Sequence, residues 1–112
     1  MKKIMIEDDN YLSAEGIEKN IDWETLNAEI IHVCYNGTSA IEAMKKEPAD
    51  LIISDIEMPD LDGISMSRQA LEINPMVKII LISAYDKFEY ARRALLLGAL
   101  DYIEKPLDYA YL

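Results

Sequence analysis

The sequence DLIISDIEMPDLDG, residues 50–63, joins a short apolar run to an acidic turn and then to an Asp-Gly step. The run 50–54 has three consecutive apolar residues at its centre and no alternation, which is typical of a strand buried on both faces of a parallel sheet. A helix is expected from Gly63 to Ile73, where the Asn74-Pro75 step ends it. A buried strand followed closely by a helix indicates an α/β fold.

The same alternation continues through the rest of the chain. Further strands are expected at 3–7, 29–35, 77–83 and 100–103, and further helices at 11–21, 38–46, 87–97 and after Pro106. Five strands alternating with helices predict a parallel sheet with helices on both faces. Because ligands of such folds bind at the carboxyl ends of the strands, the residues at those ends are the candidates for function.

The bulk composition sets limits on function. The chain has 112 residues, enough for a single domain, and a formal net charge of −10, which argues against gripping a nucleic-acid backbone. Its one cysteine, Cys34, has no partner for an internal disulfide, and no apolar run approaches the ~20 residues of a membrane span. We therefore expect a cytoplasmic protein without membrane contact.

Polar side chains gather at the predicted strand ends. The first strand ends in Glu7-Asp8-Asp9, the third in Ser54-Asp55, the fourth in Ser83, and the fifth in Glu104-Lys105. In a doubly wound sheet these ends can form one cleft that holds at least three carboxylates, a hydroxyl and an ammonium. Ionised carboxylates this close repel one another, and a hard divalent cation such as Mg2+ relieves the repulsion.

Two kinds of role are open to these residues. Asp8 and Asp9 can simply cap the next helix, Ser83 can cap a turn, and Lys105 can be a surface lysine. Their joint placement favours chemistry instead, with Asp55 as a carboxylate nucleophile that accepts a phosphoryl group. Phosphoryl transfer depends mainly on positioning and on neutralising charge, which Mg2+, Lys105 and Ser83 would supply.

Four stretches together resemble the receiver domain of two-component response regulators: IEDDN (6–10), SDIEMPDLDG (54–63), ILISAYD (80–86) and GALDYIEKP (98–106). The resemblance covers nearly the whole chain, and the D-x-x-M-P-x-x-D-G pattern is specific. It implies a flavodoxin-like (CheY-like) doubly wound sheet of five parallel strands in the order 2-1-3-4-5, with the last helix truncated. It also implies a regulatory domain that assists its own phosphorylation and dephosphorylation, not a true enzyme.

The resemblance implies a role for each site residue. Asp55 would take the phosphoryl group from a sensor histidine kinase, and Mg2+ would be held by Asp8, Asp9, Asp55 and the backbone carbonyl of Glu57. Some receivers carry Glu-Asp as the acidic pair, so Glu7-Asp8 is the alternative to Asp8-Asp9. Glu7 departs from the family's usual residue, and it either adds negative charge near the cleft or faces solvent.

The remaining implied roles concern the output. Ser83 and Lys105 would bind the phosphoryl group, and Ser83 with Tyr102 would form the switch. A homodimer through the face formed by the fourth expected helix (87–97), the fifth strand (100–103) and the helix after Pro106 is a further expectation. The sequences around Trp23 and at 83–91 resemble receivers fused to AraC-type helix-turn-helix domains in Gram-positive bacteria. We therefore expect residues 1–112 to be a fragment of a longer regulator that contacts DNA only through a C-terminal domain.

Three other classes of protein are alternatives to a phosphorylated receiver. A haloacid-dehalogenase-like phosphatase usually has a second Asp two residues after the nucleophile, where this chain has Glu57. A flavodoxin-like cofactor binder needs a phosphate loop after the first strand, where acidic residues 7–9 would repel phosphate. A degenerate receiver would lack members of the site, and all are present here. His32 and Cys34 are expected to be structural.

Overall fold

The computed structural model describes residues 1–58, 60–83 and 101–104, with Ser83 and the last four described by their backbone alone. The expected helices at 87–97 and after Pro106 lie outside these residues. The elements are β1 (Lys2–Glu7), α1 (Tyr11–Asn20), β2 (Ala28–Cys34), α2 (Gly37–Lys46), β3 (Leu51–Asp55), α3 (Gly63–Ile73), β4 (Lys78–Ser83) and β5 (Asp101–Glu104). The five predicted strands and three of the predicted helices are thus confirmed, with ends within one residue of those expected.

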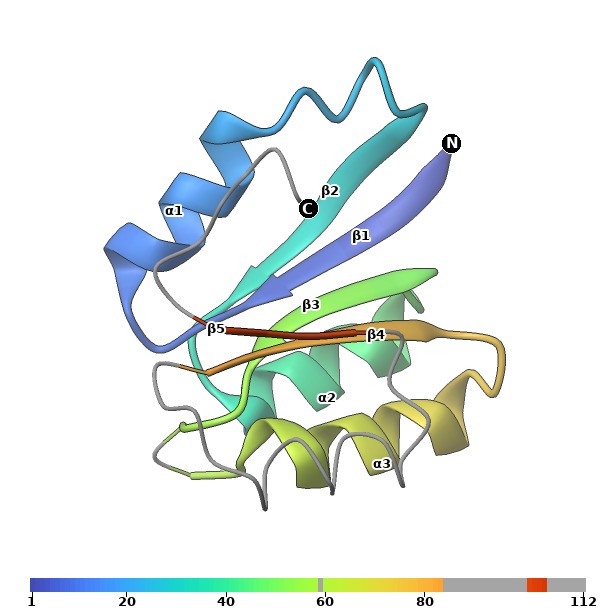
Figure 1. Ribbon diagram of the computed structural model, residues 1–112. Coiled ribbons are helices and arrows are strands. Elements are labelled where there is room, and N and C mark those ends of the chain that lie inside the picture. The colour runs from blue at the N-terminus through green and yellow to red at the C-terminus, as the bar shows by residue number, and fades with distance from the viewer. Residues whose placement is uncertain (59, 84–100, 105–112) are drawn as a thin grey trace.

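The strands form a single parallel sheet in the order β2-β1-β3-β4-β5, as predicted. Helix α1 lies on one face of the sheet, and α2 and α3 lie on the other (Figure 1). Alternate residues of β1 serve the two faces, since Met5 joins the core under α2 and α3 whereas Ile4 and Ile6 join the core under α1. The expected burial of the sheet on both faces is therefore observed.

A polar side chain caps each described helix where the chain leaves the carboxyl edge of the sheet. Asn10 accepts the N–H groups of Leu12 and Ser13 at the start of α1. Asn36 caps α2, and Asp62 caps α3. Such caps typically contribute about 1 kcal/mol each. Helices α1 and α2 begin within four residues of the preceding strand, whereas a longer connection joins β3 to α3.

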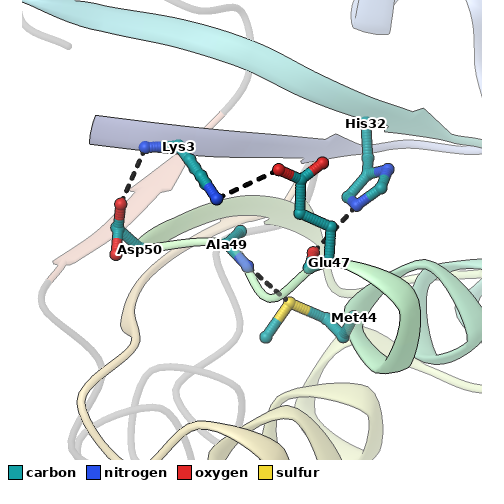
Figure 2. A network of polar contacts seen from close by, with 6 residues as sticks. All are labelled: Lys3, His32, Met44, Glu47, Ala49 and Asp50. Carbon is teal, nitrogen blue, oxygen red and sulfur yellow. Dashed lines mark hydrogen bonds and ion pairs between the residues drawn. The ribbon is translucent and has the colours of Figure 1, made fainter. Parts of the chain in front are cut away.

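Polar contacts around Lys3 connect the chain at the amino ends of the strands (Figure 2). The backbone N–H of Lys3 donates to Asp50 Oδ2 at 2.8 Å, and its ammonium lies 3.0 Å from Glu47 Oε2. His32 Nε2 lies 3.0 Å from the carbonyl oxygen of Glu47, which gives His32 the structural position expected for it. These contacts hold the α2–β3 connection against β1 and β2.

An apolar hollow of about 460 Å³ lies on the face of the sheet that carries α1. Its lining includes Trp23, Ile4, Ile53 and Ile80. Trp23 packs against the α1-side core and donates its indole N–H to the carbonyl of Glu18 at 3.1 Å. Among the described helices, none is long and apolar enough to cross a membrane.

Candidate functional site

Three aspartates come together at the carboxyl edge of the sheet. Strands β1 and β3 are neighbours and pair Glu7 with Ser54, so the residues that follow, Asp8 and Asp55, emerge side by side. One carboxylate oxygen from each of Asp8, Asp9 and Asp55 lies within 4.8 Å of the others. Asp8 is 1% exposed and Asp55 6% exposed, whereas Asp9 is open to solvent. The structure therefore brings these three carboxylates into one group with an open side.

The position of Asn10 bears on whether the aspartates serve only as caps. The cap of α1 is Asn10 and neither aspartate. Asp8 Oδ1 accepts the backbone N–H of Asn10 at 2.9 Å, which holds the turn between β1 and α1. The capping alternative for Asp8 and Asp9 is therefore wrong, and Asp9 reaches the group of carboxylates from an exposed turn.

The donor set of this group suits Mg2+. Mg2+ prefers oxygen ligands and typically takes one or two carboxylates together with waters and phosphate oxygens. The three aspartates offer only carboxylate oxygens. Asp9 is exposed, so water and phosphate oxygens can reach a cation at this position. Glu57 lies beside them, because its backbone N–H donates to Asp55 Oδ1 at 3.3 Å. The residues present thus fit a hard divalent cation.

Glu7 does not belong to this group. Its side chain is 1% exposed and lies 3.3 Å from the Ser54 hydroxyl, and its second oxygen, Oε1, has no hydrogen-bond partner among the described residues. Burial raises the pKa of Glu7 to about 9, although the Ser54 hydrogen bond acts in the opposite direction. The expectation that Glu7 faces solvent is wrong, and at neutral pH its carboxyl is protonated. The carboxylates gathered with Asp55 are those of Asp8 and Asp9.

The other expected site residues are placed only in part. Ser83 ends β4, and its backbone pairs with Glu104 of β5 at the same edge of the sheet. Tyr102 pairs with Leu81 in the same ladder. The side chains of Ser83 and Tyr102, and the whole of Lys105, lie outside the described residues. Their proposed contacts with a phosphoryl group stay predictions.

One residue near the site, Asp60, was missed by the sequence reasoning. It follows the Met-Pro step between β3 and α3 and accepts the backbone N–H groups of Gly37 and Thr38 at the start of α2, each at 3.1 Å. Its partners are more than twenty residues away in sequence, so no local pattern signals the contact. The nearest clue in the sequence is that an Asp stands in the loop before α3, and that this loop and the start of α2 lie at the same edge of the sheet.

A doubly wound sheet of this order with grouped aspartates at the carboxyl edge defines the class of receiver-like signalling domains. The sequence matches the response regulator receiver domain family over residues 4–112, and the chain belongs to that family. It is therefore a receiver domain of the two-component response regulators, as the resemblance implied.

Its relatives include transcriptional regulators. The chain is 33% identical over 108 residues to the uncharacterized transcriptional regulatory protein YesN of Bacillus subtilis, covering 96% of this chain but only 29% of YesN. The receiver domain of AraT, a response regulator from Geobacillus stearothermophilus, superposes with a TM-score of 0.92 at 34% identity, over 98% of this chain and 85% of that one. The two-component transcriptional regulator AraC from Clostridium phytofermentans superposes with a TM-score of 0.85 at 32% identity, over 99% and 85%.

Proposed function

We propose that this receiver domain accepts a phosphoryl group on Asp55 from the phosphohistidine of a sensor histidine kinase. The grouping of Asp8, Asp9 and Asp55 at one strand edge carries the proposal, because it joins a nucleophilic carboxylate to a set of cation ligands. In the transfer, a carboxylate oxygen of Asp55 bonds to phosphorus as the phosphorus–nitrogen bond to the kinase histidine breaks. The bonding electrons return to the imidazole.

The neighbouring residues hold and balance charge in this reaction. Asp8, Asp9, Asp55 and the backbone carbonyl of Glu57 would hold Mg2+, which when bound neutralises charge on the phosphoryl oxygens. The N–H of Glu57, at 3.3 Å from Asp55 Oδ1, orients the Asp55 carboxylate. Lys105 is proposed to pair with the phosphoryl group. Family membership is consistent with a regulatory module of this kind and gives no support to the phosphatase alternative.

The proposed readout is a change in packing. The phosphoryl group on Asp55 adds charge and acceptor oxygens, which draw the hydroxyl of Ser83 toward them and leave room for Tyr102 to rotate. The two packings exist in equilibrium, and phosphorylation shifts their populations. The shifted packing is proposed to favour a homodimer through the face formed by the expected helix at 87–97, β5 and the expected helix after Pro106. Replacing Tyr102 with Ala should keep phosphorylation but weaken dimerisation measured by sedimentation, and unchanged dimerisation would remove Tyr102 from the switch.

The output is proposed to be control of transcription. YesN is named a transcriptional regulator, and this chain spans less than a third of its length. A C-terminal AraC-type DNA-binding domain in the same polypeptide would supply contact with DNA, since the formal net charge of −10 on this chain disfavours such contact. The proposed location is the cytoplasm, where the kinase presents its phosphohistidine.

The test of the proposal is phosphorylation by a small donor. Wild type, Asp55→Asn and Asp22→Asn are incubated with acetyl phosphate and Mg2+ and then analysed by intact mass and Phos-tag electrophoresis. Asp22→Asn makes the same chemical change after α1, where the Asp22 carboxylate accepts hydrogen bonds from the backbone N–H and the hydroxyl of Thr25. Wild type and Asp22→Asn should each gain one phosphoryl group, and Asp55→Asn none. An adduct that persists in Asp55→Asn, or its absence from wild type, refutes the proposal.

A further inference from the structure

The connection between β3 and α3 is fastened to the start of α2 by one side chain. Asp60 Oδ1 accepts the N–H of Gly37, and Oδ2 accepts the N–H of Thr38, each at 3.1 Å. Oδ1 also accepts the N–H of Leu61 at 2.8 Å. The Asp60 carboxylate thus connects the β3–α3 loop to the start of α2. The N-cap of α2 is Asn36, which directly precedes the helix and accepts the third N–H, that of Ser39, at 2.8 Å.

Two glycines permit this close approach. A Cβ on Gly37 would meet the carbonyl oxygen of Leu61 and lie 2.6 Å from its Cβ. A Cβ on Gly63 would meet the carbonyl oxygen of Asp55 and lie 2.9 Å from the Cα of Ile56. At the base of the loop, Gly63 N–H donates to the carbonyl of Ile56 at 2.7 Å. The loop is therefore held at its base by the bond between Gly63 and Ile56, and within its length by Asp60, which binds the start of α2.

The charge of Asp60 suits this position. Its hydrogen bond with the Thr38 side chain, together with the backbone N–H groups around it, lowers the pKa of Asp60 to about 2 even though the side chain is exposed. The carboxylate is therefore ionised throughout the physiological range. A negative charge at this point also interacts favourably with the N-terminal end of the α2 dipole.

We propose that Asp60 is a positioning residue for the phosphorylation site: by binding the start of α2 it fixes the loop that carries Glu57 beside Asp55. Glu57 is three residues before Asp60, and its backbone already contacts Asp55 Oδ1. Loss of the Asp60 bonds frees the loop to move away from α2, and the backbone of Glu57 moves with it. The inference rests on the proposed function, because it assigns Asp60 a role in holding the same cation.

The test compares Asp60→Asn and Asp60→Ala with wild type in the intact protein. Mg2+ affinity is measured by calorimetric titration, and exchange of the Gly37 and Thr38 amide hydrogens reports whether the loop has left α2. Supporting groups around a metal site typically change its affinity 10-fold or more, so both variants should weaken Mg2+ binding by roughly 10-fold. Phosphorylation of Asp55 by acetyl phosphate should then need correspondingly more Mg2+, with its rate at saturation nearly unchanged.

Two further variants separate positioning from helix stability. Asn36→Ala removes the cap that α2 draws from its own sequence and leaves Asp60 in place, so it should lower the melting temperature without changing Mg2+ affinity. Gly37→Ala keeps the N–H donor but presses on Leu61, so it should weaken Mg2+ binding as the Asp60 variants do.

The outcomes distinguish the inference from the proposed function. Wild-type Mg2+ affinity in Asp60→Asn and Asp60→Ala overturns the inference alone, provided that wild type is still phosphorylated at Asp55. An equal loss of affinity in Asn36→Ala also overturns it, because the effect would then come from fraying of α2. A wild-type protein that neither binds Mg2+ nor gains an adduct overturns both.

Discussion

Replacing Glu7 with Gln should make the metal-free protein more stable at neutral pH. Glu7 is buried beside Ser54, and its Oε1 has no hydrogen-bond partner among the described residues. Gln has nearly the same shape and no proton to lose. The variant therefore removes the titration of this side chain while changing the packing little.

The size of the effect follows from the pKa of Glu7, which burial raises from 4.5 to about 9. Between these values the unfolded chain has lost the proton and the folded chain keeps it. The folded state then binds more protons, so the free energy of unfolding falls as the pH rises from about 4.5 toward 9. Each pH unit in that window costs about 1.4 kcal/mol, which gives roughly 3 kcal/mol at pH 7.

The assay is urea unfolding of wild type and Glu7→Gln at pH 5.5, 6.5 and 7.5, with EDTA present to exclude divalent cations. The difference in unfolding free energy between the two proteins should widen by about 1.4 kcal/mol per pH unit. Glu42→Gln, at an exposed position on α2, is the matched control and should follow wild type at every pH. A constant difference between wild type and Glu7→Gln across this range would refute the assignment of a protonated Glu7.

Two substitutions and one labelling experiment test the core and the loop. Met5→Ala removes a fully buried side chain under α2 and α3, so it should lower the unfolding free energy by about 2–5 kcal/mol in urea titrations. A smaller loss would mean that neighbouring core side chains move in to fill the cavity. Burial raises the pKa of Cys34 to about 11, so at pH 8 its thiol should react with a disulfide reagent only after unfolding, and rapid labelling of the native protein would contradict this. Gly63→Ala forces a Cβ against the backbone of Asp55 and Ile56. It should lower the unfolding free energy by about 1–3 kcal/mol in the same titrations and slow phosphorylation of Asp55. A wild-type unfolding free energy would show that the loop adapts to the added methyl group.

The parallel sheet and the meeting of its strand ends could be predicted, because both follow from repeated features of the sequence. Apolar runs of four to seven residues separated by helical segments indicate parallel strands, and the grouping of Asp8, Asp9 and Asp55 follows once β1 and β3 are neighbours. The family pattern supplied the strand order itself. The parallel strands and the aspartates at their ends, in contrast, follow from periodicity and from residue type at strand ends, which can be read from short stretches of the sequence.

Two residues near the site could not be understood in this way. Glu7 stands beside two aspartates in the sequence, but it is the last residue of β1 and packs beside Ser54 on the neighbouring strand. Its burial depends on how the strand end is covered, and its neutral state depends on that burial. Asp60 binds Gly37 and Thr38, partners that only the packed fold brings near. Both features depend on contacts between elements distant in sequence.

The grouped aspartates also belong to turns that lead to helices on opposite faces of the sheet. Asp8 and Asp9 belong to the turn that leads into α1 on one face of the sheet, whereas Asp55 leads into α3 on the other (Figure 1). A cation bound to all three would link the turns that feed both layers, and only the folded chain offers that link. A free Mg2+ concentration of 100 times the dissociation constant would then add about 2.7 kcal/mol to the unfolding free energy. The concentration of free Mg2+ would thereby become a determinant of how firmly the two layers of the domain are held together.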